Sequence, residues 1–186
     1  KPQAGTEYFV NFNVTTVEKE PLIPIGHEIA CDQFRLPIES PKKAFKTSGP
    51  KLTVSTNGDN LSASSSKVNF VFNRKTGIVT SYKVDGTEYF SEGFGIQPNF
   101  WRAPTDNDYG NGMPKRLQVW KESSKNFNVT DATVTMDGNN AVVNVNYLLP
   151  AGNLYIVNYT IYPSGAVNVA ARFTSTDMDA AQTGEI

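Results

Sequence analysis

The feature that most constrains this chain is a succession of short strand-like segments, separated by turn dipeptides, between residues 52 and 173. Asn57-Gly58 and Asp85-Gly86 mark two of the turns, and Pro163-Ser164-Gly165 marks another. Asn, Asp and Gly accept the positive φ that tight hairpins require, so consecutive segments are expected to pair antiparallel. The expected strands are residues 52–56, 61–65, 68–72, 78–84, 87–90, 128–136, 141–149, 154–162 and 166–173.

The first forty residues carry a different pattern. Residues 6–16 alternate apolar and polar side chains, which predicts a half-buried strand, and residues 29–36 predict a second strand. Two strands alone do not make a stable domain, so this part is expected to belong to a sandwich whose remainder lies upstream. Residues 37–50 contain three prolines, three lysines and two serines, a composition typical of linkers. The predicted organisation is residues 1–40, a linker at 41–50, and a second domain at 51–186.

Composition narrows the function classes. The 186 residues have a net charge of −1, which gives no electrostatic footprint for nucleic acid or an anionic membrane. No apolar run approaches the ~20 residues that span a bilayer. A single cysteine and a single histidine leave little material for a disulfide framework or a metal site. Lys1 indicates that the true start of the protein is not included. The predicted fold class is all-β, with one short helix near residues 114–123, where Pro114 suits a first turn.

Residues 99–110 fit neither strand nor helix. Asp106 and Asp108 could be the paired carboxylates of a glycosidase, ligands of a hard cation, or side chains that stabilise a turn. A calcium loop needs further oxygen donors and a late glutamate, which is missing, and the turn role is favoured. Trp101 and Tyr109 could stack on a sugar or belong to the core.

Other candidates have simple structural explanations. His27 beside Glu28 is not accompanied by a nucleophile motif, and Cys31 is expected to be a small buried hydrophobe. Asn13, Asn60, Asn128 and Asn158 begin Asn-x-Ser/Thr triplets, which arise by chance in a chain this rich in these residues.

The run Phe-Trp-Arg-Ala-Pro-Thr-Asp-Asn-Asp-Tyr-Gly at residues 100–110 resembles the signature that opens the C-terminal small-chain domain of family 2 β-galactosidases. Phe-Asn-Arg-Lys-Thr-Gly at 72–77 resembles a turn of the same family, and Trp120-Lys121 resembles the end of the helix after the signature. Residues 26–30, with Gln33 and Phe34, are similar to the last strands of the immunoglobulin-like domain before it.

The resemblance implies a β-supersandwich of the galactose-mutarotase kind from residue 51, preceded by a partial immunoglobulin-like sandwich. It implies a retaining enzyme whose two catalytic glutamates, sugar-binding histidines and cation sites lie in a separate barrel domain. No catalytic residue and no cofactor or metal site is therefore expected in this segment, although the family often uses divalent and monovalent cations in the barrel. None of the chain's glutamates matches a catalytic position of the family: Glu7, Glu18, Glu20, Glu28, Glu39, Glu88, Glu92, Glu122 and Glu185.

The resemblance also implies a mobile loop over the active-site mouth that begins at Gly110. Gly110 and Gly112 bracket Asn111 and suit a hinge.

The expected partners are other domains of the same polypeptide and a galactoside bound at the parent active site. No nucleic acid and no membrane is expected as a partner, and the parent enzyme could be an oligomer. The residues do not distinguish the cytoplasm from the periplasm of a bacterium. The alternative is an autonomous carbohydrate-binding module that uses Trp101 and Tyr109. A mutarotase-like activity is disfavoured, because His27 lies outside the relevant domain. The expected lid and sugar-contacting residues are Trp101, Arg102, Asp106, Asp108, Tyr109, Gly110, Asn111 and Gly112.

Overall fold

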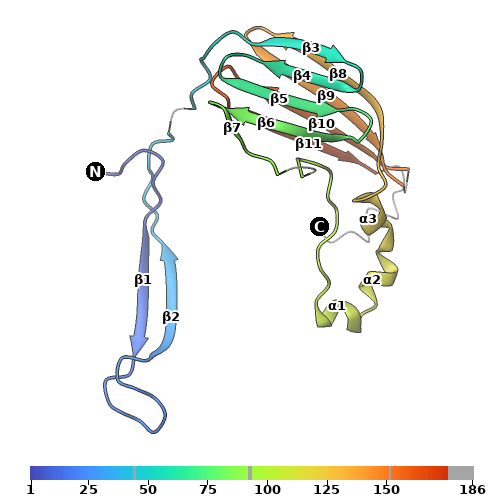
Figure 1. Ribbon diagram of the computed structural model, residues 1–186. Coiled ribbons are helices and arrows are strands. Elements are labelled where there is room, and N and C mark those ends of the chain that lie inside the picture. Colours follow the sequence, from blue (N-terminus) through green and yellow to red (C-terminus); the bar gives the residue numbers. More distant parts are fainter. Residues whose placement is uncertain (44, 92–93, 151, 176–186) are drawn as a thin grey trace. The chain divides into compact units, whose positions relative to one another are not determined.

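The computed structural model describes residues 1–43, 45–91, 94–150 and 152–175, and its strands pair antiparallel throughout (Figure 1). The all-β prediction is confirmed. The chain divides into two compact units, Lys1–Phe45 and Lys46–Ile186. The expected turn residue 151, the carboxylates Glu92 and Glu185, and residues 176–186 lie outside the described residues. Within the described ranges, no helix is long and apolar enough to cross a membrane.

The first unit contains one antiparallel pair, β1 (Phe9–Thr15) and β2 (Glu28–Arg35). On one face of this pair the Phe12 and Phe34 rings meet edge to face at 5.9 Å. Both rings remain about half exposed, at 56 % and 51 %. The alternation therefore predicted the strand correctly, but the predicted half-burial is wrong within this unit. Within the described residues of this unit, no second sheet packs on the ribbon.

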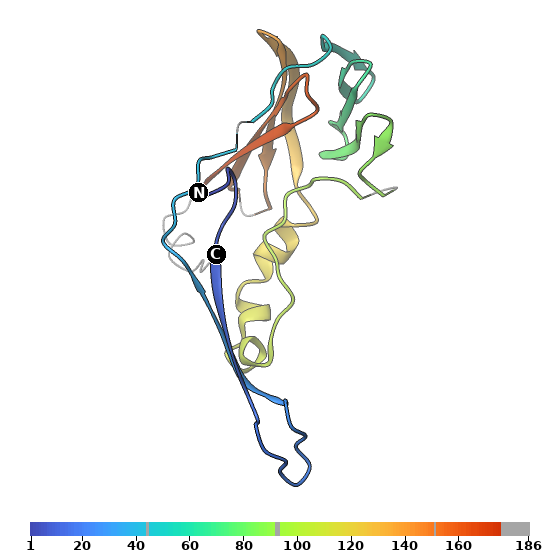
Figure 2. The same ribbon diagram turned by 90° about the vertical axis from the view of Figure 1, so that its left-hand side faces the viewer.

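The second unit is a sandwich of two antiparallel sheets, which Figure 2 shows as separate layers. Positive φ at Gly58 (57°), and at Asp85 (51°) with Gly86 (81°), builds two of the tight turns that the sequence predicted. The first sheet has the order β3-β4-β5-β6-β7 and the second the order β11-β10-β9-β8. The strands are β3 (Thr53–Asn57), β4 (Asn60–Ser64), β5 (Val68–Asn73), β6 (Ile78–Val84), β7 (Thr87–Glu88), β8 (Asn128–Asp137), β9 (Asn140–Leu148), β10 (Leu154–Ile161) and β11 (Val167–Thr174).

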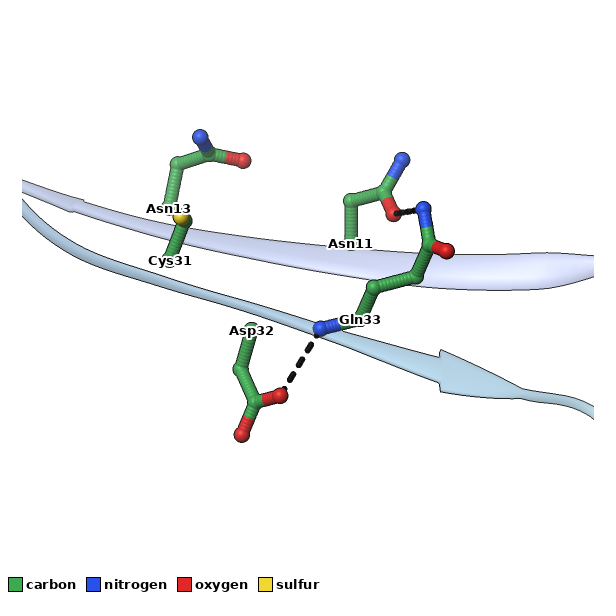
Figure 3. A pocket seen from close by; sticks show the side chains of 5 residues that line it. All are labelled: Asn11, Asn13, Cys31, Asp32 and Gln33. Atoms are coloured by element: carbon green, nitrogen blue, oxygen red, sulfur yellow. Dashed lines mark hydrogen bonds between the residues drawn. The ribbon is translucent and has the colours of Figure 1, made fainter. Parts of the chain in front are cut away.

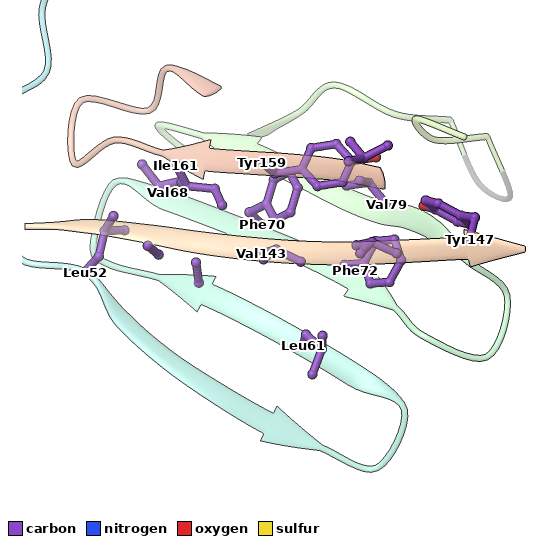
Figure 4. Packing of buried hydrophobic residues seen from close by; sticks show 14 of the residues in the cluster. Leu52, Leu61, Val68, Phe70, Phe72, Val79, Val143, Tyr147, Tyr159 and Ile161 are labelled. Atoms are coloured by element: carbon purple, nitrogen blue, oxygen red, sulfur yellow. The ribbon is translucent and has the colours of Figure 1, made fainter. Parts of the chain in front are cut away.

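The core lies between the two sheets and is rich in aromatic rings (Figure 4). Inward positions alternate along β5, β9 and β10, as period-two strands require. Tyr159 packs 5.5 Å from Phe70 and 6.2 Å from Phe72, ring centre to ring centre, and so joins the two layers. The fully buried members are Leu52, Leu61, Ala63, Val68, Phe70, Phe72, Val79, Ala141, Val143, Val145, Tyr147, Leu149, Val157, Tyr159 and Ile161.

Two tyrosine hydroxyls add polar links between the layers. Tyr147 of β9 donates to the carbonyl of Gly77, in the turn between β5 and β6, at 2.9 Å. Tyr82 of β6 donates to the carbonyl of Gly165, in the turn between β10 and β11. Burial raises the pKa of Tyr147 far above its ordinary value, and raises that of Tyr159 to about 12. Both phenols are therefore neutral across the physiological range.

Three short helices separate the sheets in sequence: α1 (Asp106–Gly110), α2 (Met113–Arg116) and α3 (Gln118–Ser123). The sequence predicted one helix near 114–123 and a loop before it, and both details need correction. Leu117 leaves helical geometry at φ −107° and ψ 20°, which divides the predicted helix into α2 and α3. Residues 106–110 form a helical turn because Asp108 accepts the backbone N–H of Thr105, in the manner of a capping box.

We expect Tyr147→Phe to lower the free energy of unfolding by about 1–3 kcal/mol, because it leaves the Gly77 carbonyl without its buried donor. For a chain of this size that corresponds to roughly 2–4 °C in Tm per kcal/mol. Tyr89→Phe is the control, because Tyr89 is 61 % exposed. Urea unfolding of both variants checks the prediction, and equal losses would contradict it.

Candidate functional site

Residues 101–123 form a helical excursion that leaves the sandwich after the first sheet and returns directly into β8 (Figure 1). The approach to it follows β6, where the Val79 N–H donates to the Ile96 carbonyl at 3.0 Å. Gly95 lies so close to β6 that an added Cβ would stand 1.5 Å from the Val79 carbonyl oxygen. The chain that enters the excursion is thus fixed against the sheet by backbone contact, which requires glycine at position 95.

An aromatic cluster holds the base of the excursion on the second sheet. The Phe100 ring lies 5.1 Å from Tyr155 of β10 and 6.2 Å from Phe173 of β11, measured between ring centres. Trp120 of α3 lies 6.1 Å from Phe100 and 5.6 Å from Phe173. Trp120 therefore packs against Phe100 and Phe173, and these contacts dock α3 on the sheet.

The tip of the excursion is organised by an ion pair between Arg102 and Asp108. Arg102 donates to both carboxylate oxygens of Asp108, with N–O distances of 2.5 and 2.9 Å. Thr105 adds its backbone N–H at 2.6 Å and its hydroxyl at 2.9 Å. The bonds from Arg102, followed by the backbone bond from Thr105, hold the pKa of Asp108 far below its usual range. Asp108 is therefore a permanent anion that shapes the loop, while the neighbouring Asp106 is exposed.

The remaining expected site residues are Trp101, before α1, and four residues at or near the junction of α1 and α2. Tyr109 is 66 % exposed on α1, whereas Trp101 is half-buried. The Asn111 side chain accepts the Met113 N–H at 2.9 Å. Gly112 adopts φ 72°, a left-handed conformation that suits glycine, whereas Gly110 ends α1 without a positive φ. Tyr109 is the most exposed aromatic ring of this segment.

The candidates in the first unit do not converge on a catalytic arrangement. Cys31 is exposed on β2, so the prediction that it is buried is wrong; that face of the two-stranded ribbon is open. Figure 3 shows Cys31 beside Asn11, Asn13 and Gln33 on the polar face, where Gln33 donates to Asn11 at 2.8 Å. A hydrogen bond and the charge of Glu28 raise the pKa of the Cys31 thiol, which keeps it protonated at neutral pH. His27 is exposed just before β2.

Within the described ranges, no three or more His, Cys, Asp or Glu side chains are grouped so that they could hold a metal ion. One residue that the sequence did not single out is Ser124, which bonds the backbone at both ends of the excursion. A serine just after a helix carries no sequence signal for this role, because its partner at Phe100 is 24 residues away. Tyr155 and Phe173 were missed for a similar reason: each is an ordinary inward strand residue until the fold brings it to Phe100.

Fold and site together define a two-sheet antiparallel sandwich with a tethered helical excursion. The family model described as the β-galactosidase small chain matches residues 64–184, so the chain belongs to that family. It is 34 % identical over 146 residues to a β-galactosidase of Priestia megaterium, and 28 % identical over 151 residues to one of Kluyveromyces lactis. These matches cover 77 % and 76 % of this chain but 14 % of each relative. A β-galactosidase small subunit of Latilactobacillus sakei is 26 % identical over 129 residues, covering 56 % of this chain and 39 % of that protein.

We expect Asp108→Asn to loosen the excursion while leaving the sandwich folded, because Arg102 loses its anionic partner. Trypsin should then cleave severalfold faster at Lys115 and Arg116, which are exposed on α2. Asp106→Asn is the matched control: it removes an equal charge from the same helical turn, and we expect it to be cleaved at the wild-type rate. Mass spectrometry of the fragments identifies the cut sites. Equal protection of both variants would show that the ion pair does not order the tip.

Proposed function

We propose that this chain is a non-catalytic part of a longer β-galactosidase of glycoside hydrolase family 2. In that enzyme the sandwich serves as scaffold and domain interface, and the helical excursion forms one wall of a galactoside site on another domain. The observation that carries the proposal is the excursion itself, which is anchored on the core at its base and has an exposed aromatic ring, Tyr109, at its tip. The relatives named β-galactosidase supply the substrate class.

The proposed parent hydrolyses terminal β-D-galactosides with retention, which needs two carboxyl groups about 5–5.5 Å apart in the roles of acid/base and nucleophile. In the excursion, Asp108 is committed to Arg102 and Thr105, and this supports a catalytic pair on a different domain. The cations that assist family 2 enzymes are proposed to bind there too. In the proposed enzyme, this chain excludes water from the active site and contacts the sugar or its leaving group from one side.

The exposed Tyr109 ring also favours one alternative, a carbohydrate-binding module that acts by itself. Titration of the chain with galactose and with lactose separates the two functions. Binding at millimolar concentration or tighter, abolished by Tyr109→Ala or Trp101→Ala, would favour the module. A flat titration would favour the wall of a composite site.

We expect the isolated 186-residue chain not to hydrolyse o-nitrophenyl β-D-galactoside, whereas the polypeptide encoded by its complete open reading frame does. The physical reason is that the two catalytic carboxyl groups are proposed to belong to the barrel domain. Release of nitrophenol, followed by absorbance, checks both proteins. Turnover by the isolated chain that disappears when one of its own carboxylates is replaced would overturn the proposal.

In the complete polypeptide, we expect Tyr109→Ala to raise KM for the same galactoside severalfold while kcat changes less, because a wall contact contributes mainly to binding. The control is Asn139→Ala, an exposed position in the turn after β8, at the far end of that strand from α3. A strand of this length extends roughly 30 Å. Identical kinetics for both variants would show that the tip does not contact the galactoside site.

A further inference from the structure

The two ends of the helical excursion are joined by a single side chain. The Phe100 N–H donates to Ser124 Oγ at 2.6 Å, and the Ser124 hydroxyl donates to the Trp120 carbonyl at 3.0 Å. One hydroxyl therefore accepts a hydrogen bond from the chain that enters the excursion and donates one to the helix that leaves it. We call this junction, formed by Phe100 and Ser124, the neck of the excursion.

The neck is set in the aromatic cluster already described. Phe100 belongs to the entering chain and Trp120 to the returning helix, while Tyr155 and Phe173 belong to the second sheet. Ser124 itself is only partly buried. The hydrogen bond between Phe100 and Ser124 joins the two ends of the excursion. The aromatic rings hold this junction against the second sheet.

Inside the excursion, consecutive elements are also bonded to one another. Asp108 ties the start of α1 to Arg102, and the Gly112 N–H donates to the Tyr109 carbonyl at 3.1 Å. The Arg116 N–H donates to the Gly112 carbonyl at 3.0 Å, and Asn111 bonds to Met113. Residues 110–112 thus form a turn that is stabilised by hydrogen bonds, and the left-handed conformation of Gly112 is part of that turn. Free rotation there would break several hydrogen bonds at once.

We propose that Ser124 is a positioning residue that closes the neck, so that residues 101–123 move as one body instead of hinging at Gly110 and Gly112. The consequence for a galactoside site rests on the proposed function, but the neck itself is a property of this chain. An excursion closed in this way keeps the spacing between its base and Tyr109 constant. It presents the tip as a unit, and its orientation is set at Phe100 and Ser124.

Adjacent serines supply a matched test. Ser124→Ala removes both bonds of the neck, and Ser124→Thr keeps a hydroxyl at the same position. Ser123→Ala removes a neighbouring hydroxyl that is fully buried and has no hydrogen-bond partner in the described part of the chain. Native-state hydrogen exchange by mass spectrometry reads opening along the whole excursion, and the amides of β9 and β10 report whether the sandwich stays folded.

We expect Ser124→Ala to speed exchange across residues 101–123 together, by about three- to tenfold, the range of a lost hydrogen bond. The β9 and β10 amides should keep their wild-type rates. Ser124→Thr should restore most of the protection, and Ser123→Ala should leave it unchanged. Fluorescence gives a second readout, because both tryptophans of the chain, Trp101 and Trp120, lie in the excursion. Faster exchange confined to residues 110–112, or equal effects of Ser123→Ala and Ser124→Ala, would overturn the proposal.

Exchange is measured without galactoside, so the outcome does not depend on the proposed function. If Ser124→Ala loosens the excursion but the complete polypeptide carrying it keeps its KM and kcat, the role of the neck is established. The proposal that the excursion forms a wall of the galactoside site is then refuted. An unchanged excursion would refute the neck, whatever Tyr109→Ala does to KM.

Discussion

The packing of two aromatic-rich inner sheet faces is the interaction on which the rest of this chain depends. Phe70 and Phe72 from one sheet meet Tyr159 from the other, and the hydroxyls of Tyr147 and Tyr82 bond carbonyls across the interface. Tyrosine is suited to this place because its ring adds buried apolar area while its polar end satisfies a turn carbonyl that would otherwise lose its hydrogen bond with water. The same tyrosine side chains therefore stabilise both the turns that carry those carbonyls and the packing of the two sheets.

The helical excursion takes its stability from this core and contributes little core of its own. Its helices have five, four and six residues, far below the length at which an isolated helix is stable in water. They persist because Trp120 and Phe100 pack on β10 and β11, and because Arg102, Asp108, Asn111 and Ser124 supply bonds that the short helices cannot make internally. Order in the excursion therefore comes from specific side-chain bonds, whereas order in the sheets comes from periodic burial.

This difference explains how much the sequence could predict. Alternation and turn dipeptides placed the strands of the second unit to within a residue or two, since period two and positive φ at Gly58 or Gly86 are local properties. The division of residues 113–123 at Leu117 and the helical turn at 106–110 were missed, because both depend on bonds between side chains and backbone. Ser124 was missed because its partner Phe100 is 24 residues away. Burial of Cys31 was predicted wrongly because a strand pattern implies a covering layer, and the described residues of the first unit form only a two-stranded sheet.

Two carboxylates of the second unit, Asp108 and Glu88, are held as anions by hydrogen bonds. Asp108 accepts bonds from Arg102 and Thr105, and Glu88 accepts backbone N–H groups of Tyr82 and Phe90 at 2.8 and 3.2 Å. Desolvation raises the pKa of Glu88, although the residue is exposed, but the bonds from Ser81, Tyr82 and Phe90 outweigh that effect and lower the pKa. A general acid needs the opposite environment, one that raises its pKa toward the working pH. Carboxylates held as anions by backbone donors act as caps of turns and hairpins. Asp108 and Glu88 thus lack the environment of a general acid, and their hydrogen bonds stabilise the turns around them.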